Sequence, residues 1–135
     1  MQDKVFIDTN VFIYAYSNDE QSKKKKAVEC LEEYNCYTST QALNELSNVL
    51  IRKFNMKSED IKNVIDEICD TCEVIAIDST IIKKALDVND TYKFSYYDSL
   101  MLSTAISGEC SKILSEDMND GQIIEKTLKI TNVFK

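Results

Sequence analysis

Four acidic side chains occupy positions from which they could share one site. Asp8 closes a short apolar run near the start of the chain, and Asp117 follows another apolar run much later. In an open α/β sheet, ligands bind beyond the carboxyl ends of the strands, so acids at these points can face a ligand rather than the core. Glu45 and Asp98 lie within predicted helices between them. The function therefore depends on whether these four acids converge.

Clustered carboxylates favour one kind of chemistry. They repel one another and raise one another's pKa unless cations are present. Mg²⁺ and Mn²⁺ remove this conflict, because these ions take oxygen ligands and keep some of their waters. Such an ion can activate a water and stabilise the negative charge that develops during phosphodiester cleavage. The chain has no histidine, which fits oxygen-only coordination and disfavours histidine-based ribonuclease chemistry.

Three of the acids also have a purely structural explanation. Glu45 lies on the border between the polar and apolar faces of its predicted helix, as many amphipathic boundary residues do. Asp98 is on the inward face of its helix, but with Ser95 it could instead form a capping box. Asp117 could belong to an ordinary acidic turn. An EF-hand is excluded there, because Gln122 stands where the calcium loop requires glycine.

The elements that must position these acids alternate along the chain. This alternation predicts a parallel sheet covered by helices. Side chains that can cap the predicted helices are Asn10, Ser39 or Thr40, Ser58, Ser79 and Ser95. The apolar run at 74–77 is suited to a buried strand. The predicted order is strand 4–8, helix 10–17, helix 22–34, strand 36–38, helix 40–53, helix 58–70, strand 74–77, helix 79–89, helix 96–107, strand 111–115 and a last strand near 126–130.

Size and composition limit the possible classes of protein. With 135 residues, 44% of them hydrophobic, we expect a single domain spanning 1–135. No apolar stretch long enough for a membrane span or a secretory signal is present, so we expect a soluble, cytoplasmic protein. Two glycines are too few for Rossmann or Walker phosphate loops. The five cysteines predict reduced, mostly buried thiols, and Cys69 and Cys72 lack the further ligands that zinc needs.

The charge of the chain bears on its substrates. A net charge of −7 argues against a surface that coats nucleic acid, since phosphate binding uses many Lys and Arg contacts. It leaves room for a metal-dependent enzyme acting on nucleic acid, because bound cations invert the local field. The run Lys23–Lys26 is the main positive feature. We interpret it as the solvated first turn of a helix in preference to a dedicated RNA contact.

With these residues in place, the sequence resembles a PIN-domain endoribonuclease of the kind found as the toxin of bacterial and archaeal toxin–antitoxin pairs. The resemblance spans nearly the whole chain. Its motifs are Phe6-Ile7-Asp8-Thr9-Asn10-Val11, Ala42-Leu43-Asn44-Glu45-Leu46, Tyr96-Tyr97-Asp98-Ser99-Leu100 and Leu114-Ser115-Glu116-Asp117.

The resemblance implies a three-layer α/β/α fold with a central parallel sheet of about five strands. It also implies hydrolysis of single-stranded or loop RNA at one or two Mg²⁺ or Mn²⁺ ions, with Asp8 and Asp98 as direct ligands. Glu45 would position or activate the attacking water, and Asp117 would complete the pocket. The remaining implications are a homodimer, an antitoxin that occupies the pocket, and supporting roles for Asn10, Ser115 and Asp120.

Two rival functions remain open. Asp8-Thr9-Asn10-Val11 approximates the nucleophile motif of haloacid-dehalogenase-type phosphatases, but that motif needs an aspartate where Asn10 stands. The second rival is a catalytically silent module that uses the fold only to hold a partner.

Overall fold

The computed structural model describes residues 3–135. Each predicted element is present with its ends within three residues of those predicted, and one further strand, β5, was not predicted. The strands are β1 (Lys4–Ile7), β2 (Asn35–Ser39), β3 (Glu73–Ile75), β4 (Lys112–Leu114), β5 (Ile123–Ile124) and β6 (Leu128–Thr131). The helices are α1 (Thr9–Ala15), α2 (Gln21–Glu33), α3 (Thr40–Arg52), α4 (Ser58–Thr71), α5 (Ser79–Tyr92) and α6 (Tyr96–Ser107).

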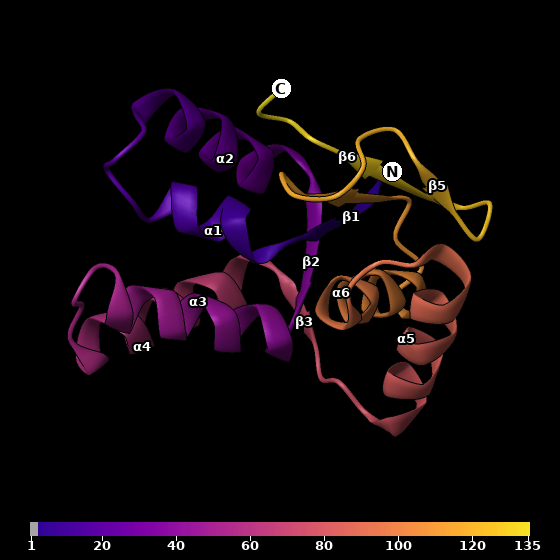
Figure 1. Cartoon of the computed structure of the whole chain (residues 1–135). Helices are drawn as coiled ribbons and strands as arrows, with labels where there is room; N and C mark the ends of the chain where they lie inside the picture. Colours follow the sequence, from indigo (N-terminus) through magenta and orange to yellow (C-terminus); the bar gives the residue numbers. More distant parts are fainter. Residues whose placement is uncertain (1–2) are drawn as a thin grey trace.

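The six strands form one mostly parallel sheet in the order β3-β2-β1-β4-β6-β5 (Figure 1). Only the pairing of β5 with β6 is antiparallel. β1 pairs with β2 on one side and β4 on the other, with Ile7 opposite Leu114. The strand order reverses at β1, and such switch points are where open α/β sheets bind their ligands. The predicted α/β fold is confirmed, with a two-residue sixth strand added to the five expected.

Alternate residues of β1 enter separate cores on the two faces of the sheet. Val5 and Ile7 belong to a core shared with α1, α2, α3 and α4, whereas Phe6 belongs to a core built with α5 and α6. All three side chains are fully buried, because a parallel strand between two helical layers has no solvent face. Figure 1 accordingly shows α1–α4 on one side of the strands and α5 and α6 on the other.

The start of α1 corrects one prediction that matters for the site. Asp8, rather than Asn10, is the residue that caps α1, and its carboxylate accepts a hydrogen bond from Thr9 N. Asp8 can do this because it follows β1 directly and has extended backbone angles. Asn10 lies inside the first turn instead, which leaves its side chain available for contacts outside the helix.

Two other helix starts also differ from the prediction. The predicted caps Ser58 and Ser79 are the first residues of their helices, and Lys57 and Asp78 hold the cap positions. The Asp78 carboxylate accepts a bond from Ile81 N, whereas Lys57 provides no side-chain cap. The predicted caps Ser39 and Ser95 are confirmed at the starts of α3 and α6.

Burial also corrects the sequence interpretation of β3. The apolar run at 74–77 was expected to form a buried strand, but β3 is an edge strand with an exposed first residue and two half-buried ones. The cysteines agree with expectation: all five are free thiols, and Cys69 alone is exposed. Within residues 3–135, no helix is both long and apolar enough to cross a membrane.

Candidate active site

The four predicted acids line one pocket of about 200 Å³ at the carboxyl ends of β1 and β4. Asp8 follows β1, and Asp117 lies in the loop after β4. Glu45 reaches the pocket from the first half of α3, and Asp98 from the first turn of α6. The pairing of β1 with β4 brings Asp8 and Asp117 to the same edge, although 109 positions of sequence separate them.

Asp8 is the most buried of the four acids, with 8% of its surface exposed. Its Oδ1 accepts a bond from Thr9 N, and its Oδ2 accepts a bond from the Ser115 hydroxyl, each at 2.8 Å. Burial raises the pKa of Asp8 to about 6, with smaller contributions from the charges of Asp98 and Asp117. The carboxylate is therefore held in place by neutral donors while its charge remains uncompensated.

Glu45 is half-buried and faces the same region. Thr9 Oγ1 donates to Glu45 Oε2 at 3.4 Å, a long contact. Burial raises the pKa of Glu45, and the charge of Asp8 adds to the effect. Glu45 therefore combines the expected boundary position on α3 with a carboxylate directed into the pocket.

Asp98 takes part in only half of the capping box that the sequence allowed. Ser95 Oγ accepts a bond from Asp98 N at 3.2 Å, but Ser95 N gives no bond to the Asp98 carboxylate. Burial raises the pKa of this carboxyl and the charge of Asp117 contributes, while the Ser95 side chain lowers it. The carboxylate of Asp98 is thus available to the pocket.

Asp117 is exposed and is oriented by a residue from α1. Asn10 Nδ2 donates to Asp117 Oδ2 at 2.9 Å, across 107 residues of sequence. The Asn10 side chain also lines the pocket, and its buried Oδ1 has no hydrogen-bond partner among residues 3–135. A buried acceptor left open in this way is costly unless a donor or cation reaches it.

The supporting residues predicted from the sequence divide into two groups. Asn10 and Ser115 contact two of the acids, as described. Asp120 does not line the pocket: its Oδ1 accepts a bond from Asn132 N, and its Oδ2 lies 3.8 Å from Lys135 Nζ. Asp120 therefore holds the C-terminal segment.

Sequence reasoning missed the contacts that fix the loop carrying Asp117. Glu116 accepts a 2.6 Å bond from Tyr14 OH and another from Lys23 Nζ. Lys23 also lies over the Tyr14 ring, 4.8 Å from its centroid. Lys23 is thus bound within its own chain, whereas the sequence interpretation placed it in a solvated first turn. No pattern in the sequence pairs positions 23 and 116. Thr9, which contacts both Asp8 and Glu45, could have been identified as a site residue because it directly follows Asp8 in the sequence.

The PIN domain family matches residues 5–120, most of the chain. The chain belongs to the PIN domain family. Three solved structures with the same fold are similar to this PIN domain at low identity. A toxin–antitoxin complex from Klebsiella pneumoniae has a TM-score of 0.71 at 18% identity, covering 96% of this chain and 97% of that chain. VapC20 of Mycobacterium tuberculosis, described as a Sarcin-Ricin loop cleaving toxin, has a TM-score of 0.70 at 13% identity, covering 84% of this chain and 89% of that chain. VapBC2 of Rickettsia felis, bound to a DNA fragment from its promoter, has a TM-score of 0.68 at 16% identity, covering 96% of this chain and 99% of that chain. No curated protein matches the chain.

Nucleases with PIN domains generally use divalent metal ions, and the pocket of this PIN domain fits such an ion in its donor chemistry. Its acidic groups are all carboxylates, and the open Oδ1 of Asn10 adds a neutral oxygen. Within residues 3–135, no group of three or more His, Cys, Asp or Glu side chains is arranged as a ready metal cage. Mg²⁺ is commonly held by one or two carboxylates with waters and substrate phosphate, so a preformed cage is not required.

Proposed function

We propose that this PIN domain is a Mg²⁺- or Mn²⁺-dependent endoribonuclease that hydrolyses single-stranded or loop RNA and acts as the toxin of a toxin–antitoxin pair. One observation carries the proposal: four carboxylates line one pocket at the switch point of the sheet, and none of them has a cationic partner among the described side chains. Uncompensated acids around an open pocket are suited to a hard divalent cation.

The proposal gives each acid a role. Asp8 and Asp98 would hold the ion, Asp8 being fixed by Ser115 and Thr9. A bound divalent ion would activate a water and stabilise charge on the phosphate. Burial raises the pKa of Glu45, which makes its carboxylate a stronger base for accepting a proton from the attacking water. Asp117, oriented by Asn10, would complete the acidic rim.

The test is a Mn²⁺ titration followed by an RNA cleavage assay on a pool of structured RNAs. We expect metal-dependent cleavage that is lost in Asp8→Asn and Asp98→Asn, while circular dichroism shows that folding is retained. The matched control is Asp66→Asn, which changes an exposed acid on α4 outside the pocket. Equal cleavage by wild type and both site variants would indicate contamination and refute the proposal.

Two alternative functions have distinct outcomes in the same experiments. A mass increase of an aspartyl-phosphate on Asp8 would favour a phosphatase of the haloacid dehalogenase type. If the protein neither bound Mn²⁺ nor cleaved any RNA, a silent binding module would be favoured. The PIN family match and the absence of an aspartate at position 10 favour the nuclease over the phosphatase.

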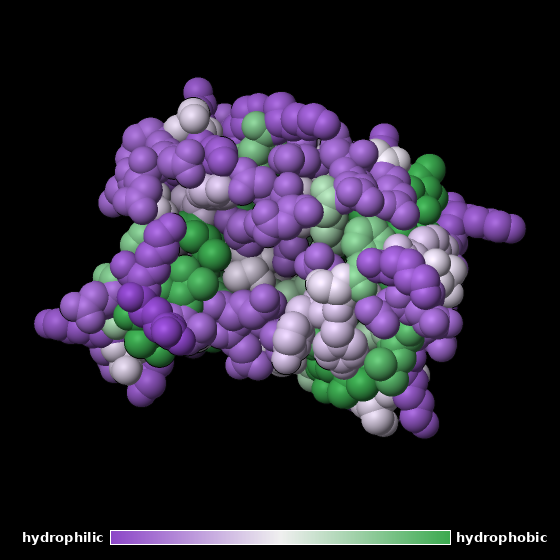
Figure 2. Space-filling view, viewed as in Figure 1, coloured by the Kyte–Doolittle hydropathy of each residue, from purple (hydrophilic) through white to green (hydrophobic). Residues whose placement is uncertain are grey.

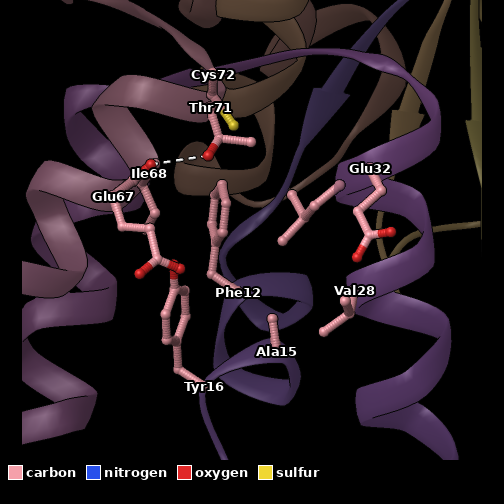
Figure 3. Close-up of a pocket in the computed structure, with 10 residues that line it drawn as sticks. Phe12, Ala15, Tyr16, Val28, Glu32, Glu67, Ile68, Thr71 and Cys72 are labelled. Carbon is pink, nitrogen blue, oxygen red and sulfur yellow. Dashed lines mark hydrogen bonds between the residues drawn. The ribbon is translucent and has the colours of Figure 1, made fainter.

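The proposed antitoxin is a basic segment that occupies the acidic pocket, and we propose that an apolar part of the same partner binds a second cleft of the molecule. This cleft of about 440 Å³ lies among α1, α2 and α4. Figure 3 shows Phe12, Ala15 and Val28 directed into it, with Glu32 and Glu67 beside them. Such a surface suits a helix with apolar residues on one face and Lys or Arg beside them. We expect Glu67→Lys to weaken the complex with the antitoxin, measured by calorimetry, whereas Asp66→Lys leaves it unchanged.

The proposed homodimer has a candidate interface on α5. Ile82 and Leu86 lie one turn apart on this helix and are 39% and 53% exposed. Figure 2 shows hydrophobic side chains gathered around this end of the face, and a second such group on its opposite side in the region of α1 and α3. Contiguous exposed apolar patches mark contacts between protein chains, and this pair would form part of such a patch. We expect Leu86→Glu to convert a dimer to a monomer in sedimentation velocity, and a wild-type monomer would refute the dimer.

A further inference from the structure

The active-site pocket has an apolar side as well as an acidic one. Besides the acids and their polar neighbours, it is lined by Ile13 of α1, Val49 of α3 and Tyr97 and Met101 of α6. Val49 stands four residues after Glu45, on the same face of α3, and Tyr97 directly precedes Asp98. Any substrate whose phosphate reaches the acids must therefore pass close to an apolar surface.

Charge attraction cannot hold the substrate at this pocket without help. No lysine or arginine is among the residues that line it, and the chain as a whole carries a net charge of −7. A bound cation would offset the repulsion at the phosphate it contacts, but not at neighbouring phosphates beyond its reach. Binding energy for the rest of the substrate must come from groups that do not depend on charge.

Tyr97 has the properties of such a group. It is 58% exposed, the largest exposed fraction among the large hydrophobic side chains described. Its hydroxyl makes no hydrogen bond within residues 3–135, so no polar contact explains its position. An edge-to-face contact with Tyr96, at 5.4 Å between centroids, restrains the ring. Tyr96 in turn packs against the buried cluster of Ile81, Ala85 and Leu100.

An edge-to-face neighbour covers at most one face of a ring. Tyr97 therefore presents an uncovered aromatic face or edge at the rim of the pocket, on a helix whose following residues are buried. Bases of single-stranded RNA stack on aromatic side chains held in this way, and stacking tolerates any sequence. A restrained ring loses little conformational entropy when a base binds.

We propose that Tyr97 is a base-stacking site: a nucleobase next to the phosphate that enters the acidic pocket stacks on the Tyr97 ring and lies against Ile13 and Val49. This inference rests on the proposed ribonuclease function, because it names how the same pocket grips single-stranded RNA. Removing the ring by Tyr97→Ala should weaken binding of a short RNA by about 5- to 150-fold, the usual loss for one stacked base. Tyr97→Phe should retain most of the affinity, since it keeps the ring.

The chain contains no tryptophan, which allows a direct optical test. Tyr97→Trp introduces a single indole at the proposed site, and Ile123→Trp introduces one on β5, at a residue that is 57% exposed, as a matched control outside the pocket. The probes are two pentamers of equal charge, uridine pentanucleotide and its fully abasic ribose-phosphate analogue. Each pentamer is titrated into the Trp variants in the presence of Ca²⁺. Binding is measured from the indole fluorescence, so the readout does not depend on cleavage.

We expect the uridine pentamer to quench the indole at position 97 and the abasic pentamer to leave it nearly unchanged, with no quenching at position 123. Equal quenching by both pentamers, or equal affinity of wild type and Tyr97→Ala for the uridine pentamer, would overturn the inference. If Tyr97→Ala weakened only the complex with an antitoxin, the ring would belong to a protein interface instead. If Tyr97→Ala cleaved RNA and bound it with the same affinity as wild type, the stacking site alone would be refuted. If wild type bound neither Mn²⁺ nor RNA, the proposed function would be refuted as well.

Discussion

Neutralising Asp8 should stabilise the metal-free protein while it abolishes metal binding. Asn at position 8 keeps the shape of the side chain, and its Oδ1 can still accept the bond from Thr9 N. In wild type the Ser115 hydroxyl donates to Asp8 Oδ2. In Asp8→Asn the side-chain NH₂ group takes the place of Oδ2 and can donate to the Ser115 hydroxyl oxygen instead. What Asp8→Asn removes is a buried negative charge that no cation offsets in the protein alone.

The magnitude follows from the pKa of Asp8. Burial raises this pKa from 3.8 to about 6, and a tenfold change in proton affinity corresponds to about 1.4 kcal/mol. The folded state therefore binds the proton more tightly than the unfolded state, and the free energy of unfolding falls as the pH rises from about 4 to 6. Above pH 6 the ionised carboxylate lowers the free energy of unfolding by about 3 kcal/mol, which is the upper limit for the gain in Asp8→Asn.

The assay is urea denaturation in EDTA at pH 5 and pH 7.5. Wild type should lose about 1.4 kcal/mol from this residue between the two pH values, because at pH 5 Asp8 is still mostly protonated in the folded state. Glu45 and Asp98 add to the loss in the same direction, since burial raises their pKa values too. Asp8→Asn should show a smaller loss and greater stability than wild type at pH 7.5.

Metal should reverse this order. Mn²⁺ at 1,000 times its dissociation constant stabilises a protein by about 4.1 kcal/mol, which is more than the upper limit of about 3 kcal/mol that the buried charge costs. Asp8→Asn should gain little, and the control Asp66→Asn should respond to both EDTA and Mn²⁺ as wild type does. If Asp8→Asn proved less stable than wild type in EDTA at pH 7.5, the carboxylate would stabilise the empty site and the reasoning would be wrong.

Three further variants test separate parts of the structure. Ser115→Ala removes the hydroxyl that donates to Asp8 Oδ2, so we expect it to weaken Mn²⁺ binding several-fold in calorimetry, and unchanged affinity would contradict an orienting role. Leu50→Ala empties a fully buried position on α3 and should lower the free energy of unfolding by about 2–5 kcal/mol in urea; a loss below about 1 kcal/mol would mean that the core closes over the gap. Gly121→Ala places alanine at a φ of +90°, so it should lower the free energy of unfolding by about 1 kcal/mol or more without changing Mn²⁺ affinity. An unchanged midpoint of urea denaturation would show that the turn relaxes to accommodate alanine.

The order of elements could be predicted because burial leaves a periodic signal in the sequence. A strand covered on both faces must be apolar throughout, as at 5–7, and α3 buries Ala42, Leu46 and Leu50 at helical spacing. β5 escaped prediction because two residues are too few to show any period. The burial of β3 was overestimated because an apolar run does not reveal whether its strand has a neighbour on both sides.

The four acids could be predicted for a different reason. Parallel strands present their carboxyl ends at one edge of a sheet, so Asp8 and Asp117 share that edge once β1 and β4 are known to pair. The side-chain contacts could not be predicted in the same way. The bond from Asn10 to Asp117 depends on α1 starting one residue earlier than expected, and no local pattern encodes that shift.

Two adjacent acids in the loop after β4 show how the fold separates structure from function. Glu116 is paired with Lys23, and hydrogen bonds from Lys23 and Tyr14 outweigh its burial and lower its pKa. Among residues 3–135, the side-chain partner of Asp117 is the neutral Asn10 amide. Asp8 and Glu45 likewise receive neutral donors, which fix the position of a carboxylate without cancelling its charge. A pocket whose acids are oriented but not neutralised retains its attraction for a cation, and the ion pair of Glu116 holds the loop in place while leaving that charge untouched.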